Sequence, residues 1–211
     1  MQISQPRCSN VLSNTHDVDY RLAQLGLSRG LIWSAIDRAA VAHAFAPSHG
    51  FRGNANYRAA DDGIHALRTT PSDAGWHEYN FLGIPCAINR DENIAISVTT
   101  GDENTGVLTD DDPATVTIKG PSTTVAAGQL DYSSTDSQTY GIDYFVLLGF
   151  WAGDETRCEL SRPKIQDNQG RISGWGERIL IYRPTNDPLR PKRQTPVEPA
   201  ADVPTMRRRV A

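Results

Sequence analysis

The first third of the chain carries apolar residues at the three- and four-residue steps that are typical of helices with one buried face. Between residues 17 and 46 these positions are Leu22, Leu25, Leu31, Ile32, Ile36, Ala39, Ala40 and Ala44. Gly26 interrupts the run, and Ser28 after it is a residue type that favours the N-cap of a new helix. The pattern therefore predicts two helices, over residues 17–25 and 29–45, joined by a short turn.

A third helix is predicted over residues 57–68. One face of this helix carries Tyr57, Ala60, Ile64 and Leu67. At the start of the first helix, Thr15 or Asp17 is expected to be the N-cap, because both side chains can accept a hydrogen bond from a backbone amide.

From residue 76 onward the hydrophobic period changes to two, which is typical of strands. Ile94, Ile96 and Val98 alternate with small or polar residues in the clearest example. Strands are predicted over residues 84–89, 93–100, 114–118, 142–152, 156–161 and 178–182. Because the helices precede the strands along the chain, we expect an α+β fold, with N-terminal helices packed on a mainly antiparallel β-sheet.

The composition changes sharply from residue 184 onward, where six prolines occur among few large apolar residues. Such a segment buries too little apolar surface to offset the entropy of ordering it, so it is predicted to be a disordered tail. The chain then divides into an N-terminal extension (1–14), a single domain (15–183, with a helical part 15–70 and a sheet part 76–183) and the tail (184–211).

Charge is distributed unevenly between these parts. The formal net charge is −4, yet from residue 183 onward seven basic residues stand against three acidic ones. Arg207, Arg208 and Arg209 in this basic tail are candidate contacts to nucleic acid or to an acidic partner. The alternative is a tail that only increases solubility.

Other features exclude several classes of protein. No apolar run approaches the roughly 18 residues that span a bilayer, and the first residues lack the apolar core of a signal peptide. The three cysteines, Cys8, Cys86 and Cys158, lie far apart, which indicates free thiols and no structural zinc site. We therefore expect a cytoplasmic protein without membrane association, metal or cofactor.

The two helices over 17–25 and 29–45 also fit a helix-turn-helix, in which the second helix enters the major groove of DNA. Arg29 and Arg38 would then be the nucleic-acid contacts, although Asp37 would repel phosphate. An ordinary packing hairpin shows the same pattern, and both interpretations stay open.

The first candidate for chemistry is the loop predicted after the strand 93–100. Asp102, Glu103 and Thr105 lie in it between two glycines, which allow a close backbone approach to a ligand. The carboxylates are suited to hold a divalent cation or to act as acid and base. A solvated loop has the same composition.

The second candidate is a polar group that two predicted strands share. Its members are Glu159, Arg162, Trp175, Glu177 and Arg178. If the strands are neighbours, either Glu159 with Arg178 or Glu177 with Arg157 forms an ion pair, with Trp175 covering it. The functional alternative is a polar pocket for an anion or a metal.

Three separated segments read LAQLGLSRGLI, NIAISVTTGDENTG and RCELSRPKIQDNQGRISGWGERI. In this order they resemble an uncharacterised bacterial protein family with a helical N-terminal part, a TGDE-TG motif and an ELS-P…W-ERI motif. The resemblance covers about residues 20–182. It implies no particular activity and suggests a mobile-element or defence system as the setting.

These observations favour a non-enzymatic binding or accessory protein whose partner is a protein complex or nucleic acid. The alternative is an enzyme of unknown class, such as a metal-dependent hydrolase or nuclease. That alternative requires Asp102, Glu103, Glu159 and Glu177 to converge on one cleft.

Overall fold

The computed structural model describes residues 8, 10–47, 53–69, 75–81, 83–119, 142–153, 155–166 and 170–183. The predicted disordered tail 184–211, including Arg207, Arg208 and Arg209, lies outside these residues.

Three helices form the N-terminal part, as the hydrophobic pattern predicts. They are α1 (Thr15–Gln24), α2 (Arg29–Ala44) and α3 (Asn54–Thr69). Gly26 makes the turn between α1 and α2 with a φ of +65°, a conformation that glycine adopts without strain. The Ser28 side chain accepts from the Leu31 amide and caps α2, as expected. The expected cap of α1 is wrong: Asn14 caps it by accepting from the His16 amide, because the helix already begins at Thr15.

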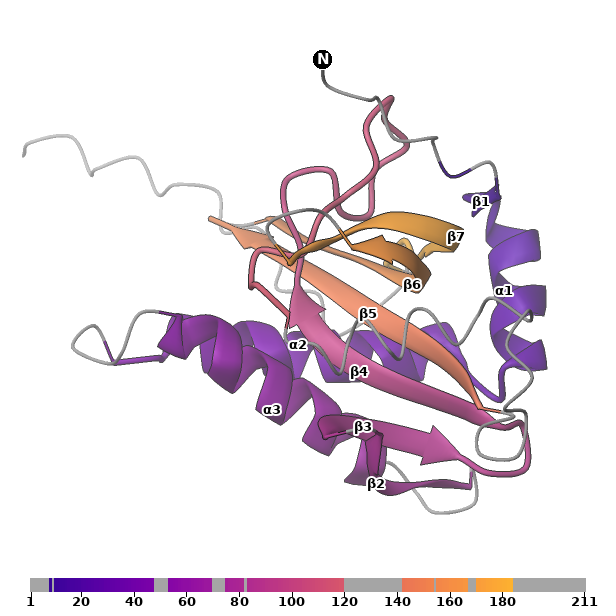
Figure 1. Cartoon of the computed structure of the whole chain (residues 1–211), viewed down its shortest axis with the longest axis horizontal. Coiled ribbons are helices and arrows are strands. Elements are labelled where there is room, and N and C mark those ends of the chain that lie inside the picture. Colours follow the sequence, from indigo (N-terminus) through magenta and orange to yellow (C-terminus); the bar gives the residue numbers. More distant parts are fainter. Residues whose placement is uncertain are drawn as a thin grey trace, which may run out of the picture.

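One seven-stranded sheet forms the rest, in the order β1-β7-β6-β5-β4-β3-β2 (Figure 1). The strands are β1 (Val11–Leu12), β2 (Trp76–Phe81), β3 (Ile84–Asn89), β4 (Ile94–Thr100), β5 (Asp143–Ala152), β6 (Glu155–Gln166) and β7 (Ile172–Leu180). The sheet is mostly antiparallel, as expected, but β4 with β5 and β1 with β7 are parallel pairs. This confirms the α+β class.

Several strand boundaries differ from the prediction. The last strand begins at Ile172, not at residue 178, because a bulge around Pro163 lets β7 continue pairing with a longer β6. The predicted strand 114–118 is only an isolated bridge between Gly101 and Thr115. Strand β1, in the segment taken as an extension, pairs with β7 through Val11 opposite Arg178.

The central strands of the sheet are buried on both faces. Helices α2 and α3 pack against each other and against one face, and α1 lies near β7 (Figure 1). The core on this helix side includes Leu22, Ile36, Leu67, Ile96, Phe145 and Ile179. The core on the opposite face includes Phe81, Cys86, Tyr144, Leu148 and Trp175.

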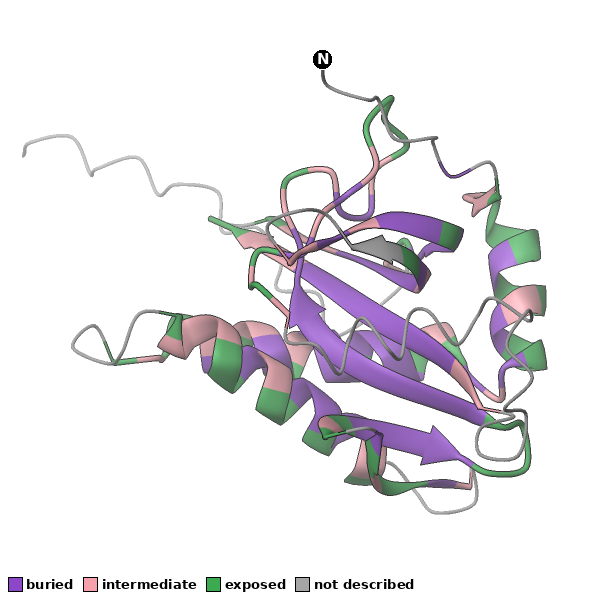
Figure 2. Ribbon diagram, in the orientation of Figure 1, coloured by how far each residue is buried: buried purple, intermediate pink, exposed green. Residues whose placement is uncertain are grey.

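Both faces of β4 are therefore buried along its whole length, as Figure 2 shows for the central strands. Segment 101–119, which connects onward from β4, lies against the second face near β6 and β7. The Thr115 amide donates to the Ile172 carbonyl at 2.9 Å there, and the Lys119 amide donates to the Gly170 carbonyl at 2.7 Å. In the described part of the chain, no helix has the length and apolar character that crossing a membrane requires.

Candidate functional site

Arg178 and Glu159 form a buried ion pair between β7 and β6. The Arg178 Nε and Nη2 atoms donate to the two carboxylate oxygens of Glu159 at 3.0 and 2.8 Å. The exposed fraction is 1% for the Arg178 side chain and 0% for the Glu159 side chain. Ser161 of β6 lies opposite Arg178 of β7 in the register. Glu159, two residues before Ser161, is therefore the diagonal neighbour of Arg178 on the same face of the sheet. The predicted cross-strand pair of Glu159 with Arg178 is confirmed.

Protein donors occupy both oxygens of the Glu159 carboxylate. Besides Arg178, the Gly106 amide donates to Oε2 at 2.8 Å and the Ser161 hydroxyl donates to Oε1 at 2.7 Å. A carboxylate with this many short hydrogen bonds anchors the loop after β4 to the sheet.

Arg178 contacts the same loop with its remaining donors. Nη1 donates to Asp112 Oδ1 at 3.1 Å, and Nη2 lies 3.4 Å from the Asn104 carbonyl and 3.2 Å from the Val107 carbonyl. Burial alone would lower the pKa of Arg178, but the hydrogen bonds and charges of Glu159 and Asp112 outweigh it and raise this pKa. The guanidinium therefore stays charged and holds the loop through its hydrogen bonds.

The acidic loop is closed on itself. The Asp102 carboxylate accepts from the Asn104 amide at 3.1 Å and from the Ala114 amide at 2.9 Å. Burial raises the pKa of Asp102, although these two amides act in the opposite direction. Thr105 is fully buried, whereas Glu103 is exposed. The TGDENTG motif therefore folds as a cover over the Arg178–Glu159 pair.

Glu177 belongs to the other face of the sheet, because neighbouring residues in a strand point to opposite faces. Its carboxylate accepts two hydrogen bonds from the Arg21 guanidinium of α1, at 2.9 and 3.0 Å. The predicted alternative pair of Glu177 with Arg157 is wrong, since Arg157 pairs with Glu155 on its own strand at 3.1 Å.

Arg162 and Trp175 also have structural partners. Arg162 forms an ion pair with Asp143 and lies over the Phe145 ring, 5.6 Å from its centroid. The Trp175 indole nitrogen donates to the Pro113 carbonyl at 2.7 Å, which fixes the end of the loop. Trp175 thus holds the end of the loop that lies over the buried pair.

The four carboxylates named for a metal centre do not converge. Asp102 and Glu159 lie near each other under one loop, Glu103 is exposed, and Glu177 binds Arg21 across the sheet. Within the described ranges, no three His, Cys, Asp or Glu side chains group in a way that would hold a metal ion. The three cysteines are free thiols, and all are buried.

The helix pair places Arg29 and Arg38 differently. The Arg29 guanidinium binds Asp19 of α1 at 2.6 Å, whereas Arg38 is exposed on α2. The buried residues of α2 are Leu31, Ile32, Trp33, Ala35, Ile36, Ala39 and Ala42. This helix therefore packs as a core element, and Arg38 is the one basic residue on its exposed stripe.

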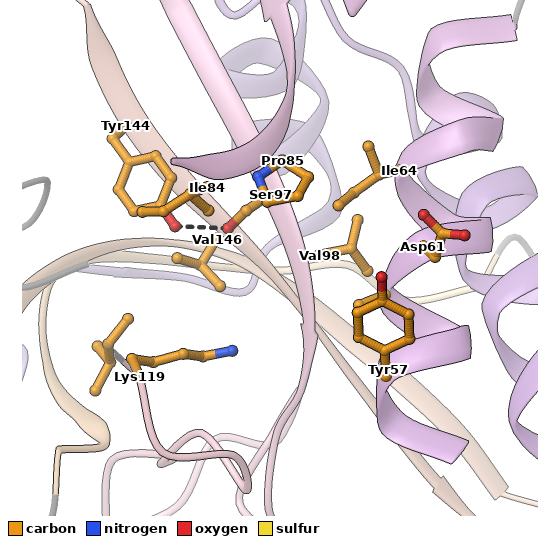
Figure 3. Close-up of a pocket in the computed structure, with 12 residues that line it drawn as sticks. Tyr57, Asp61, Ile64, Ile84, Pro85, Ser97, Val98, Lys119, Tyr144 and Val146 are labelled. Carbon is orange, nitrogen blue, oxygen red and sulfur yellow. Dashed lines mark hydrogen bonds between the residues drawn. The ribbon is translucent and has the colours of Figure 1, made fainter. Parts of the chain in front are cut away.

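A cavity of about 180 Å³, which we name the Lys119 cavity, lies beside β4 and is lined by α3 and by side chains from both faces of the sheet (Figure 3). Its lining residues are Tyr57, Ala60, Asp61, Ile64, Ile84, Pro85, Ser97, Val98, Lys119, Tyr144, Val146 and Ile172. Seven of these twelve residues are apolar and five carry a polar group. Small-molecule sites combine apolar walls with a limited set of polar groups in this way.

A divergence of two neighbouring strands opens this cavity. All six residues of β3 pair with β2, but only Ala87–Asn89 pair with β4. The first half of β3, with Ile84 and Pro85, therefore leaves the β4 edge where Ser97 follows the last paired residue. Helix α3 and Lys119 line the space beside that edge.

Lys119 carries the basic group of the cavity. Its Nζ donates to the Thr99 hydroxyl at 2.6 Å and to the Thr117 hydroxyl at 3.1 Å. The two hydroxyl oxygens are themselves 3.2 Å apart. Burial lowers the pKa of the Lys119 amine to about 8, because the surroundings disfavour its charged form.

A second polar pair lies on the same face of β4. The Ser97 and Tyr144 hydroxyls are 2.6 Å apart, and burial raises the pKa of Tyr144, so the phenol keeps its proton. Figure 3 shows Lys119 extending from one side of the cavity, with Tyr57 and Asp61 of α3 on the other. The Lys119 amine, several hydroxyls and the Asp61 carboxylate thus line a space whose remaining walls are apolar.

The sequence analysis missed this cavity. A sequence signal did exist in the alternation of Thr115, Thr117 and Lys119 with Val116 and Ile118. The polar set turns inward and the apolar pair is exposed, which inverts the usual pattern. Such an inversion is informative because large apolar residues rarely gain from exposure.

The resemblance to a bacterial family stays a prediction. Comparisons of this chain with models of protein families, with curated proteins and with solved structures found no match.

Proposed function

We propose that this is a non-enzymatic binding protein that holds a small organic acid in the Lys119 cavity. The observation that carries the proposal is the Lys119 amine, fixed by Thr99 and Thr117 at the edge of an apolar cavity. A carboxylate is the ligand group that such an end would bind.

The polar end of the cavity supports this ligand class. A lysine with a pKa of about 8 is still mostly charged at pH 7, and a carboxylate brought beside it supplies the counter-charge. The Thr99 and Thr117 hydroxyls can turn their protons toward a carboxylate oxygen, because a hydroxyl both donates and accepts. Charge-assisted hydrogen bonds of this kind are stronger than neutral ones.

The apolar walls set the size and character of the rest of the ligand. Ile64, Val98 and Val146 are among the side chains that face the space. An apolar protein cavity of about 150 Å³ holds a benzene molecule. A cavity of about 180 Å³ is therefore suited to an acid with a single ring or a short alkyl chain.

The same geometry favours binding over the alternative of a metal-dependent hydrolase or nuclease. That chemistry needs carboxylates free to ligate, but Arg178, Gly106 and Ser161 occupy Glu159, and backbone amides occupy Asp102. An accessory role beside a protein complex or nucleic acid is compatible with ligand binding, and the ligand would then signal to that partner.

Titration of the full chain with matched ligands tests the proposal. Benzoate and hexanoate are compared with benzamide and hexanamide by calorimetry or ligand-observed NMR at pH 7. We expect the acids to bind at least tenfold more tightly than the amides, and Lys119→Met to abolish that preference. The matched control is Lys164→Met, at an exposed lysine of β6 outside the cavity. Equal affinity for acids and amides, or unchanged acid binding in Lys119→Met, would contradict the proposal.

A further inference from the structure

We infer that the Lys119 amine also captures small aldehydes, as a reversible imine formed inside the same cavity. The inference rests on the proposed function only because both place their ligand in the Lys119 cavity, against the same apolar walls. It adds a covalent reaction and a second ligand class, the carbonyl compounds.

The first argument is the position of the amine. Lys119 Nζ lies where an apolar space meets two hydroxyls, so an aldehyde whose body fills that space brings its carbonyl carbon to the nitrogen. Holding two reactants together in this way replaces a bimolecular encounter with a local one. A desolvated lysine in an apolar pocket is the usual arrangement for amine nucleophiles.

The second argument is the supply of neutral amine. With a pKa of about 8, about a quarter of the Lys119 amines are unprotonated at pH 7.5. An ordinary exposed lysine is about one part in a thousand neutral at that pH. Lys164, which is exposed on β6 and lies outside the cavity, serves as an internal comparison on the same chain.

The third argument is proton transfer. The nitrogen lone pair attacks the carbonyl carbon, the C=O π electrons move to oxygen, and one nitrogen proton passes to that oxygen to give a carbinolamine. The carbinolamine then loses its hydroxyl group with a proton as water, while nitrogen gives up its second proton and forms the C=N bond. Thr99 Oγ1, at 2.6 Å from Nζ, and Thr117 Oγ1, at 3.1 Å, are within reach to relay these protons. One water leaves, and no oxidant or reductant takes part.

The apolar walls favour the dehydrated product, since an imine in contact with bulk water hydrolyses readily. Ile84, Pro85 and Ile172 line the same cavity and make part of its wall apolar. The hydroxyls of Ser97 and Tyr144 line the same cavity and can donate to a second oxygen of a ligand.

The test is reductive trapping on the full chain. The protein is incubated with benzaldehyde or hexanal and sodium cyanoborohydride, and the modified lysines are mapped by peptide mass spectrometry. We expect Lys119 to be labelled at least tenfold faster than Lys164, and labelling of the Lys119 peptide to vanish in Lys119→Met. Labelling at position 119 should rise with pH toward about 8, whereas the affinity for benzoate should fall over the same range. Labelling of Lys119 no faster than of Lys164 would overturn the inference.

Benzoate binding, measured on the same preparation, separates this inference from the proposed function. Benzoate that binds and blocks labelling of Lys119 supports both. Benzoate binding without selective labelling overturns the imine alone, and selective labelling without benzoate binding overturns the organic-acid ligand alone. Thr99→Val keeps the shape of its side chain and removes one proton relay, so we expect slower labelling in that variant with a folded-state spectrum like that of the parent.

Discussion

The Arg178 guanidinium and the Glu159 carboxylate form two hydrogen bonds, of 3.0 and 2.8 Å, in a part of the fold closed to solvent. The pair ties two strands to the loop that crosses them, since Gly106 donates to Glu159 and Asp112 accepts from Arg178. Buried ion pairs contribute little net stability when intact, but removing one partner leaves a buried charge without compensation.

Replacing Arg178 with methionine should therefore destabilise the protein strongly. We expect Arg178→Met to lower the free energy of unfolding by about 3–5 kcal/mol, because the Glu159 carboxylate stays buried without its counter-charge. Urea denaturation followed by circular dichroism measures this loss. The double variant Arg178→Met with Glu159→Leu should recover a large part of it, and a double loss equal to the sum of the two single losses would contradict the explanation.

Gly106 makes a second prediction about the same loop. Its φ of +69° is a conformation that side chains rarely adopt, and a Cβ there would lie 3.1 Å from the backbone nitrogen and oxygen of Cys158. We expect Gly106→Ala to cost about 2–3 kcal/mol, through left-handed strain and through displacement of the loop. The control is Gly153→Ala, at φ +57° with open space around its Cβ, which should cost about 1 kcal/mol. Equal losses in the two variants would show that the contact with Cys158 does not matter.

The fold followed from local patterns where one period dominates. The apolar spacing around Leu22 and Ile36 predicted helices, because each of these helices buries one face. The alternation of Ile94 with Ala95 predicted a strand, and both faces of that strand are buried. The parallel pairing of β4 with β5 did not follow, since pairing direction depends on how a long connection crosses the sheet.

The sequence predicted the Glu159–Arg178 ion pair but not the Lys119 cavity. Glu159 and Arg178 were expected to meet because neighbouring strands bring diagonal residues together. The Lys119 cavity depends on β3 leaving β4 after a few paired residues, which is a tertiary feature without a local sequence pattern. The alternation of polar and apolar residues up to Lys119 did not indicate which set faces the sheet until Thr99 of a distant strand was placed beside the lysine.

The helix pair leads to a prediction about nucleic acid. Arg29 is bound to Asp19 and one face of α2 packs in the core, so we expect any DNA affinity to depend on Arg207, Arg208 and Arg209 rather than on Arg29 or Arg38. Replacing the three tail arginines with alanine should weaken binding and reduce its dependence on salt. Fluorescence anisotropy at several salt concentrations measures both. Arg38→Ala is the matched control, and a loss of affinity in this variant would instead support a helix-turn-helix that reads DNA.

Lys119 makes a prediction about stability and pH. Burial lowers the pKa of its amine from 10.5 to about 8, so between these two values the unfolded chain binds more protons at this position than the folded chain. Stability contributed by this position must then rise as the pH increases from about 8 to 10.5, and below about 8 the charged amine opposes folding.

Lys119→Met removes the titration. We therefore expect the stability of the variant at pH 7 to lie within about 1 kcal/mol of that of the parent. As the pH rises above 8, the parent should become more stable relative to the variant. Denaturation curves at pH 7, 8, 9 and 10, with Lys164→Met as the exposed control, measure the difference. A constant difference between the parent and Lys119→Met across this range would show that the amine titrates as it does in water, and would remove the supply of neutral amine on which aldehyde capture depends.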